Sequence, residues 1–340
     1  MTVDATDANS LQSCVPDGGR LPRHAVGRSS VSIPAICFGT SGLGSMPDTY
    51  GYDVSEQVAY DTIQAIIEGP SGFLDTSRNY GFGRSEERIG HVIRALGGLP
   101  DDVVLSTKLD RDDSTNRFDA AQARRSIEQS LETLGVDRVD ILHLHDPEHA
   151  RSVDEITATG GALDELFKMK EEGLCQAVGL AAGRVDIMTP ILAERDFDVL
   201  ITHNRCTVVN ANAEPMLALA AKKGMSVMNA APYAGGALAK GTDSFKRYVY
   251  QDATPDMLKP IQTIEALCQR HHVPPGAVAL QFSMRHPQVT STICGVSKPE
   301  RIAQTLAWAT HEIPAALWEE LSQLERSTVD PESTRQYSLG

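Results

Sequence analysis

The chain has 340 residues, a formal net charge of −14 and a hydrophobic content of 41%. A chain of this length can bury enough apolar surface for one large domain or two medium ones. The acidic balance, without a dense stripe of Lys and Arg, argues against nucleic acid and anionic membranes as partners. The six cysteines are widely spaced and form no CxxC pair, so the sequence indicates neither a zinc clip nor a redox dithiol.

The two ends of the chain are polar. Residues 1–20 are acidic and lack the basic and apolar regions of a signal peptide. No apolar run approaches the roughly 20 residues that span a bilayer. We therefore expect a cytoplasmic protein, either a monomer or a homo-oligomer. It would have a flexible N-terminal tail at 1–20, a single domain at 21–326 and a C-terminal tail at 327–340.

Short apolar segments alternate with amphipathic ones along the whole domain. The predicted strands are 34–40, 72–77, 103–109, 139–145, 175–181, 199–204, 226–232 and 290–296. Helical patterns lie between and after them. In 120–135, for example, Ile127, Leu131 and Leu134 recur at helical spacing.

Eight strands with helices between them are the count of a (β/α)8 TIM barrel, an α/β fold with a parallel eight-stranded barrel. An extra helix is expected at the C-terminal end. A doubly wound sheet is disfavoured because no GxGxxG follows the first strand.

Polar residues at strand ends are informative, because such barrels build their active sites at the C-terminal ends of the strands. The second strand ends at Asp75, the third presents Lys108 and the fourth ends at His145, while Tyr80 follows in a glycine-bearing loop. Consecutive strands are neighbours in a barrel, so we expect these groups to share one pocket. A buried lysine needs a counter-charge, and Asp75 can supply it.

This set of side chains suits proton transfer at a carbonyl oxygen. An ammonium beside Tyr80 favours the phenolate, and we expect it to lower the pKa of the phenol toward neutrality. A phenol tuned in this way donates a proton to a developing alkoxide or accepts one in reverse, and His145 can bind the same oxygen. None of the four groups is an obvious nucleophile, which leaves hydride from a bound cofactor.

These segments resemble the aldo/keto reductase family over roughly residues 21–325. "LDTSRNYGFGRSEERIG" is similar to the family's Asp-and-Tyr signature, "LSTK" to its lysine strand and "VDILHLHDP" to its histidine strand. The resemblance implies a catalytic tetrad of Asp75, Tyr80, Lys108 and His145, with Tyr80 as general acid/base. "FKRYVYQDATP", "HHVPPGAVALQF" and "IPAALWEEL" are similar to the sugar-oxidising aldose 1-dehydrogenases that act on fucose-type sugars.

The resemblance also implies a nicotinamide dinucleotide in an extended groove. Within this groove, Asn204 matches the amide that holds the carboxamide, and the glycine-rich segment 232–238 matches the pyrophosphate loop. Arg301 stands where a 2′-phosphate is often met, which favours NADP(H) and leaves NAD(H) possible. The implied contacts are Gly39, Thr40, Ser41, Asp75, Asn204, Pro232, Tyr233, Gly235, Gly236, Leu238, Gly295, Ser297, Lys298 and Arg301.

The chain departs from the family pattern at three places. Ala181 and Ala182 replace a Ser-Asn pair, so a second carboxamide clamp is missing. Ala230 stands where many members stack an aromatic ring on the nicotinamide. Gly295 and Val296 replace the Lys-Ser pair of strongly NADP-selective members. The choice of cofactor therefore stays open.

Several residues have structural interpretations beside the functional ones. Ser85 is predicted to be an N-cap, a role in structure and not in catalysis. Tyr248 and Tyr250 either contact the substrate together with Tyr80 and His145 or pack their own loop.

Our main prediction is an NAD(P)(H)-dependent oxidoreductase that interconverts a sugar-type aldehyde or lactol with its alcohol or lactone. One alternative is a metal-dependent hydrolase, because His143 and His145 point to the same side of one strand, with Asp146 and His203 nearby. The other is a nucleotide-binding partner subunit without turnover. In the main prediction the protein holds no metal.

Overall fold

The structure is a computed structural model that describes residues 19–333 and 335. Parallel strands close into a barrel in the order β12-β3-β4-β5-β6-β7-β8-β9. These strands are β3 (Ile36–Gly39), β4 (Phe73–Asp75), β5 (Val104–Leu109), β6 (Val139–His145), β7 (Cys175–Ala182), β8 (Val199–His203), β9 (Ser226–Ala230) and β12 (Ser291–Gly295). Each predicted strand segment coincides with one of them, with β7 extending one residue beyond the predicted 175–181, so the expected (β/α)8 barrel is confirmed. The tail expected at 1–20 lies outside the described residues except for its last two.

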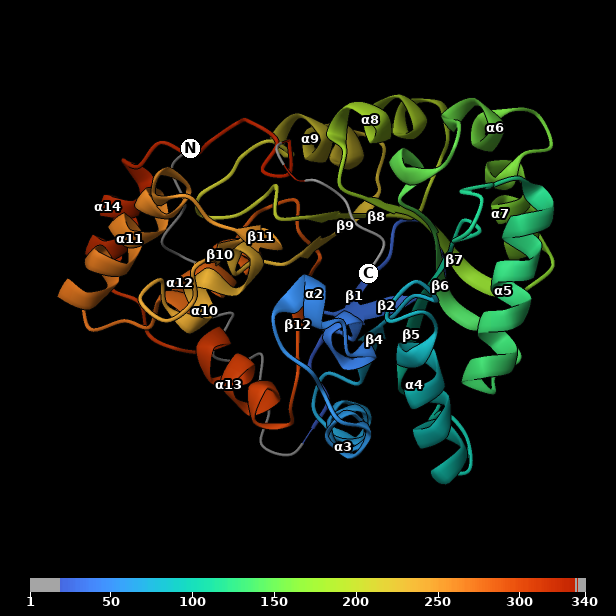
Figure 1. The fold of residues 1–340 in the computed structure, drawn as a ribbon, viewed down its shortest axis with the longest axis horizontal. Coiled ribbons are helices and arrows are strands. Elements are labelled where there is room, and N and C mark those ends of the chain that lie inside the picture. The colour runs from blue at the N-terminus through green and yellow to red at the C-terminus, as the bar shows by residue number, and fades with distance from the viewer. Residues whose placement is uncertain (1–18, 334, 336–340) are drawn as a thin grey trace.

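Helices surround the strands on the outside of the barrel (Figure 1). The long ones are α3 (Glu56–Glu68), α4 (Arg84–Ala95), α5 (Ala120–Leu134), α7 (Ala162–Glu171), α8 (Val185–Glu194), α9 (Glu214–Lys222), α11 (Pro255–Arg270), α12 (Pro275–Met284), α13 (Glu300–Ala309) and the expected extra helix, α14 (Ala315–Ser322). Shorter turns of helix are η2 (Ser41–Gly44), α2 (Pro47–Tyr50), η3 (Pro147–His149), α6 (Val153–Thr157), η4 (Ala234–Gly236) and α10 (Ala237–Lys240). The sequence pattern did not indicate α12, because this helix is buried on most of its faces and shows no apolar stripe.

A hairpin closes the N-terminal end of the barrel. It consists of β1 (Arg23–Ala25) and β2 (Ser32–Pro34), paired antiparallel. The apolar side chains of the hairpin and its turn are Val26, Val31 and Ile33. They share one buried cluster with strand residues that point into the barrel, among them Cys37, Phe73, Val104, Ile141 and Val199. With this end filled, a ligand can enter the barrel only at the C-terminal ends of the strands.

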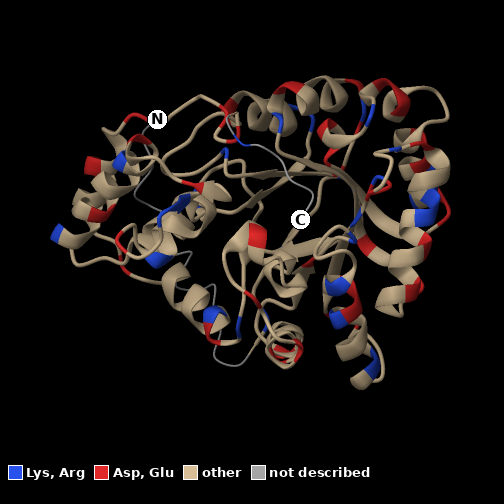
Figure 2. Cartoon of the chain, in the orientation of Figure 1, with Lys and Arg blue, Asp and Glu red and all other residues tan. Residues whose placement is uncertain are grey.

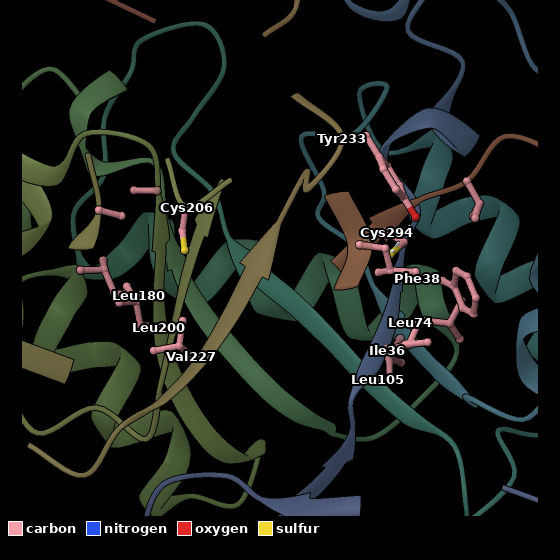
Figure 3. Close-up of a cluster of buried hydrophobic side chains, with 14 of the residues drawn as sticks. Ile36, Phe38, Leu74, Leu105, Leu180, Leu200, Cys206, Val227, Tyr233 and Cys294 are labelled. Atoms are coloured by element: carbon pink, nitrogen blue, oxygen red, sulfur yellow. Dashed lines mark hydrogen bonds between the residues drawn. The ribbon is translucent and has the colours of Figure 1, made fainter. Parts of the chain in front are cut away.

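A second cluster fills the layer between the strands and the helices. Figure 3 shows parts of it, with Ile36, Phe38, Leu74 and Leu105 on one side and Leu180, Leu200 and Val227 on the other. Ile36 and Phe38 belong to this outer cluster, while Cys37 between them belongs to the inner one. This alternation is the two-residue period of a strand packed on both faces, and it fixes which way each strand-end side chain points.

Charged residues of both signs lie interspersed on the outer helices (Figure 2). Within the part of the chain that the structure describes, no helix is both long and apolar enough to cross a membrane. The charges that matter for chemistry are instead the buried ones at the open end of the barrel.

Candidate active site

Asp75 and Lys108 form a buried ion pair at the C-terminal ends of β4 and β5. Lys108 Nζ lies 2.7 Å from Asp75 Oδ2 and also donates to the carbonyl oxygen of Thr76 at 2.6 Å. The other carboxylate oxygen accepts from Ser106 Oγ at 2.9 Å. Asp75 is 3% exposed and Lys108 is 1% exposed, so neither charge has water to solvate it. Each charge is therefore stabilised by the other and by these hydrogen bonds.

Tyr80 lies against this lysine, in the loop between β4 and α4. Lys108 Nζ is 4.7 Å from the centroid of the Tyr80 ring, and the rings of Tyr80 and His145 meet edge to face with centroids 6.0 Å apart. Gly81 has a positive φ of 64°, and a Cβ there would lie 2.1 Å from the carbonyl oxygen of Gly44. Only glycine permits this contact between the loops after β3 and β4, and the contact sets the position of Tyr80.

The start of α4 differs from the prediction. The helix begins at Arg84 with Gly83 as its N-cap, so the assignment of Ser85 as N-cap is wrong. Ser85 is buried, and its Oγ lies 2.9 Å from Thr40 Oγ1. A hydrogen bond across the barrel end thus replaces the local capping bond that the sequence suggested.

The ionisation of Tyr80 also differs from the prediction. Burial raises the pKa of Tyr80 well above its ordinary value, and the negative charges of Asp75, Asp146 and Asp110 add to the rise. The positive charge of Lys108, 4.7 Å from the ring centroid, does not outweigh burial and these negative charges. The expectation of a pKa near neutrality is wrong, and the phenol is protonated at neutral pH.

His145, at the end of β6, is held by a carboxylate that the sequence analysis missed. His145 Nδ1 lies 2.6 Å from Asp110 Oδ1, and its Nε2 lies 3.6 Å from Asp146 Oδ2. Burial by itself would lower the pKa of His145, but the charges of Asp146 and Asp110 raise it above its ordinary value. Asp110 directly follows β5, and its place at a strand end was the signal available in the sequence.

A cavity of about 1010 Å³ opens at this end of the barrel. The four predicted catalytic side chains, Asp75, Tyr80, Lys108 and His145, all line it. Among the predicted cofactor and substrate contacts, the lining includes Gly39, Ser41, Tyr233, Gly235, Gly236, Gly295, Ser297, Arg301 and Tyr250. The volume is at the upper end of the range for ligand pockets and suits a large ligand.

Other predicted contacts lie outside the described lining of this cavity, namely Thr40, Asn204, Pro232, Leu238, Lys298 and Tyr248. Thr40 is fully buried and donates its hydroxyl to the carbonyl oxygen of Asp75 at 3.0 Å. Asn204 is 1% exposed, and its Nδ2 lies 3.3 Å from His203 Nδ1. Leu238 is part of the outer core. Thr40, Asn204 and Leu238 thus belong to the layer behind the cavity wall, whereas Lys298 is exposed.

The segment after α14 forms one side of the cavity mouth. Arg205 Nη2 lies 2.7 Å from Asp330 Oδ1 and its Nη1 lies 3.1 Å from Glu332 Oε1, while the Arg205 side chain is only 2% exposed. His203 Nδ1 also lies 3.3 Å from Glu332 Oε1. Residues 327–333, expected as part of a tail, are therefore fastened to the loop after β8, and Asp330 and Glu332 line the cavity.

The model of the aldo/keto reductase family matches residues 35–326. The chain belongs to the aldo/keto reductase family. It is 29% identical to a D-threo-aldose 1-dehydrogenase from a Pseudomonas species, over 88% of this chain and 96% of that protein. It is also 29% identical to the L-galactose dehydrogenase of Arabidopsis thaliana, over 86% and 89% of the two chains. Among solved structures, the holo form of an aldo-keto reductase from Bacillus halodurans superposes with a TM-score of 0.73 at 18% identity, covering 92% of this chain and 99% of that one.

Aldo/keto reductases use NAD(P)H as cofactor and act on small carbonyl compounds. The cavity of this member has a cationic end that suits phosphate groups, with Arg301, Arg247 and Lys240 in its lining. Lys240 Nζ stands 4.6 Å from the ring centroid of Tyr52. Burial, followed by the charges of Arg301 and Arg247, lowers the pKa of Lys240. Lys240 and Tyr52 were not among the residues that the resemblance implied.

A hairpin of this aldo/keto reductase aims Tyr250 into the cavity. β10 (Arg247–Tyr248) and β11 (Gln251–Asp252) are joined by Val249 and Tyr250, whose φ values are 46° and 65°. A two-residue turn of this kind needs positive φ at both positions, a strained state for a β-branched residue. Gly235 permits it, because a Cβ there would lie 2.5 Å from the backbone nitrogen of Val249. Tyr250 also packs edge to face on Tyr50, with ring centroids 5.8 Å apart.

The metal interpretation fits the geometry poorly. His143 is fully buried, and its Nδ1 would lie 2.2 Å from a Cβ at Gly179. Its ring is therefore packed against β7. Burial, then the charges of Lys108 and His145, lowers the pKa of His143 well below its ordinary value. The nearby ammonium that lowers this pKa would also repel a metal cation.

Within the described residues, the group that approaches metal-ligand spacing is Cys206, Glu214 and His286, away from the cavity lining. Glu214 accepts from Arg326 Nη1 at 2.8 Å and lies 3.2 Å from His286 Nε2. His286 Nδ1 accepts from the backbone N–H of Gln288 at 3.3 Å, so the ring proton is on Nε2, where a metal would have to bind. This cluster is a satisfied ion-pair network.

Proposed function

We propose that this protein is an NAD(P)(H)-dependent oxidoreductase that interconverts a sugar-type aldehyde or lactol with its alcohol or lactone. The supporting observation is the Asp75–Lys108 pair buried beneath Tyr80 and beside His145, in the wall of a cavity of about 1010 Å³. Burying an ammonium is costly even when it is paired, and a protein that only binds nucleotide has no use for one at this place. This argues against the alternative of a silent nucleotide-binding subunit.

The bound dinucleotide would supply or accept a hydride at the substrate carbon. The task of the chain is to hold it, and the backbone of the cavity wall fits that task. Within the described residues, a Cβ at Gly295 would meet no atom within 4 Å, and Gly235 and Gly236 have φ values of 70° and 105°. These glycines let phosphate groups approach backbone N–H groups. Arg301, with Ser297 nearby, would bind a 2′-phosphate, so we propose NADP(H) as the preferred cofactor and NAD(H) as the alternative.

Tyr80 and His145 would hold the reacting oxygen of the substrate. A phenol that is protonated at neutral pH donates a hydrogen bond, and then its proton, to a carbonyl oxygen that gains negative charge. Asp75 keeps the Lys108 ammonium beneath the ring, 4.7 Å from its centroid. There the ammonium favours negative charge on the phenol oxygen as the proton leaves.

Four carboxylates line the cavity, namely Asp146, Glu148, Asp330 and Glu332, and the last two are paired with Arg205. Glu148 Oε1 accepts from the backbone N–H of Gly183 at 2.9 Å. Burial, followed by the charge of Asp146, raises the pKa of Glu148 to about 7. Carboxylates accept hydrogen bonds from hydroxyl groups. We therefore propose a polyhydroxylated substrate.

The similarity to proteins named for D-threo-aldose and L-galactose supports the sugar class. Tyr250 offers an aromatic face at the cavity wall, and we propose it as a substrate contact. Tyr248 lies outside the described lining and is proposed as packing.

The proposed function is tested by titrating the purified protein with NADPH and NADH in parallel, followed by turnover assays with L-galactose and NADP⁺ or NAD⁺. Tighter binding of NADPH would support Arg301 as a phosphate ligand and reduction of a sugar aldehyde. Tighter binding of NADH would favour oxidation of an aldose. If neither dinucleotide binds, the oxidoreductase proposal is refuted, and a chelator and metal screen would follow.

A further inference from the structure

The carboxylate of Asp110 binds the rear nitrogen of the His145 ring. Asp110 Oδ1 lies 2.6 Å from His145 Nδ1, and the two residues are 3% and 8% exposed. The other carboxylate oxygen accepts from Ser77 Oγ at 2.7 Å and from the backbone N–H of Asn79 at 3.1 Å. The carboxylate is thus fixed by the loop after β4 on one side and by the imidazole on the other.

This contact decides which ring nitrogen carries the proton. An ionised carboxylate has no hydrogen to donate, so His145 Nδ1 must be the donor. Burial alone would raise the pKa of Asp110, but His145 and the hydrogen bonds from Ser77 and Asn79 hold it below its ordinary value. Asp110 is therefore ionised at neutral pH. The lone pair of the neutral ring is then on Nε2, the nitrogen left for the cavity that His145 lines.

Titratable groups face His145 from the surrounding strands and loops. They are Lys108, Asp110, Tyr80, His143, Asp146, His149 and His203. Lys108 lowers the pKa of His145, as burial does, and Asp146 and Asp110 outweigh both. Among the groups that would hold the substrate oxygen, Tyr80 stays protonated, so His145 Nε2 is the proton acceptor available near neutral pH.

We infer that His145 is a second acid–base group at the substrate oxygen and that Asp110 is the positioning residue that makes it one. In oxidation, the electron pair of the substrate C–H bond leaves as hydride to the dinucleotide. The hydroxyl O–H bond breaks, its electron pair forms the second bond of the carbonyl group, and its proton passes to Nε2. The resulting imidazolium lies between Asp110 and Asp146. In reduction by this second route, the imidazolium returns this proton to the oxygen, while Tyr80 keeps its own proton and donates only a hydrogen bond. The inference rests on the proposed function, because it requires a substrate hydroxyl or carbonyl at His145.

The first test measures the ring itself and needs no turnover. Long-range ¹H–¹⁵N NMR of protein with ¹⁵N-labelled histidines distinguishes the two neutral tautomers. The signals of His145 are identified as those that disappear in His145→Gln. We expect the neutral ring to carry its proton on Nδ1. Asp110→Asn should shift the pKa of His145 downward by about one to three units, the effect of removing a neighbouring opposite charge. A neutral His145 protonated on Nε2 overturns the inference.

The second test is the pH profile of kcat/KM for oxidation of L-galactose. We expect the rate to rise with pH through the raised pKa of His145. Asp110→Asn should lower the plateau roughly 100-fold or more and move the rising limb to lower pH. Asp113→Asn is the matched control, since it removes one charge from a cavity-lining residue of the same loop that makes no hydrogen bond to His145.

The two readouts separate the two proposals. Absence of dinucleotide binding refutes the proposed function, while the tautomer of His145 is still measured. The inference is overturned if the enzyme is active but the rising limb of its kcat/KM profile does not move in Asp110→Asn. It is also overturned if the limb moves equally in Asp113→Asn. Either result leaves the oxidoreductase function intact.

Discussion

The ion pair between Asp75 and Lys108 allows a structural role to be separated from a catalytic one. Lys108→Met keeps the length of the side chain but removes its ammonium. Asp75 would then be left 3% exposed, with the Ser106 hydroxyl at 2.9 Å as its remaining side-chain donor. Removing one partner of a buried pair costs about 3–5 kcal/mol, because the other charge stays desolvated. We expect Lys108→Met to lower the free energy of unfolding by this amount.

The double variant gives the sharper result. Asp75→Asn combined with Lys108→Met removes both charges and leaves two neutral side chains of similar volume. We expect it to recover at least about 2 kcal/mol relative to the sum of the single variants, which is the coupling expected of residues in contact. Turnover should stay lost in the double variant, because no ammonium lies beneath Tyr80.

The assay is equilibrium urea unfolding followed by circular dichroism, paired with steady-state kinetics on the same preparations. Lys168→Met is the matched control. Lys168 Nζ lies 3.7 Å from Glu172 Oε1, and the two side chains are 60% and 39% exposed. It should cost about 1 kcal/mol or less. The reasoning fails if Lys108→Met costs no more than this control, or if the double variant recovers activity together with stability.

Further outcomes follow from the same site. Tyr80→Phe should leave dinucleotide affinity unchanged and lower kcat/KM by roughly 100- to 1,000-fold, the loss of one donor to developing charge; full activity would contradict the acid–base role. Arg301→Ala should weaken NADPH binding about tenfold or more and spare NADH, since a hydrogen bond to a charged group is worth about 1.5–3 kcal/mol; equal losses would remove Arg301 as the phosphate ligand. Burial raises the pKa of Glu86 from 4.5 to about 7. Between these pH values the folded state binds more protons at Glu86 than the unfolded state does. The free energy of unfolding therefore falls as pH rises from about 4.5 to about 7. Glu86→Gln should flatten that decline, which is about 3 kcal/mol at 1.36 kcal/mol per pKa unit, as measured by urea unfolding at pH 4.5 and pH 8. Arg205→Leu should release residues 327–333 to limited proteolysis, whereas unchanged cleavage would show that the segment is held by its backbone contacts.

Most of the barrel was readable from local pattern. The strand segments are short apolar runs and most of the helices carry an apolar stripe, so these elements can be recognised from their own residues. The exception, α12, is buried on most of its faces and therefore shows no period. The same local reasoning predicted the four candidate catalytic side chains, since Asp75, Lys108 and His145 lie at strand ends and Tyr80 follows in a loop.

Asp110 shows where local reasoning stops. The segment 110–113 reads Asp-Arg-Asp-Asp. The place of Asp110 directly after the strand separates it from the other two acids, but it does not show which partner Asp110 binds. Asp112 accepts hydrogen bonds from Ser114 and Thr115 within its own loop. Asp110, by contrast, accepts from residues that are distant in sequence. Which acid contacts His145 depends on the path of the chain after β5. It also depends on Ser77 and His145, which the loop after β4 and the end of β6 place beside Asp110.

The sequence by itself determined the fold class, the strand ends that carry the candidate site and the family to which the chain belongs. The fold class and the strand ends follow from period and spacing, which a few neighbouring residues define, and the family follows from the resemblance of the motifs. The tertiary structure alone decided the ionisation of Tyr80, the tautomer of His145 and the docking of residues 327–333 at the cavity mouth. The reason is that burial and Coulomb interactions sum over groups from many strands and loops, so they exist only when the chain has brought those groups together.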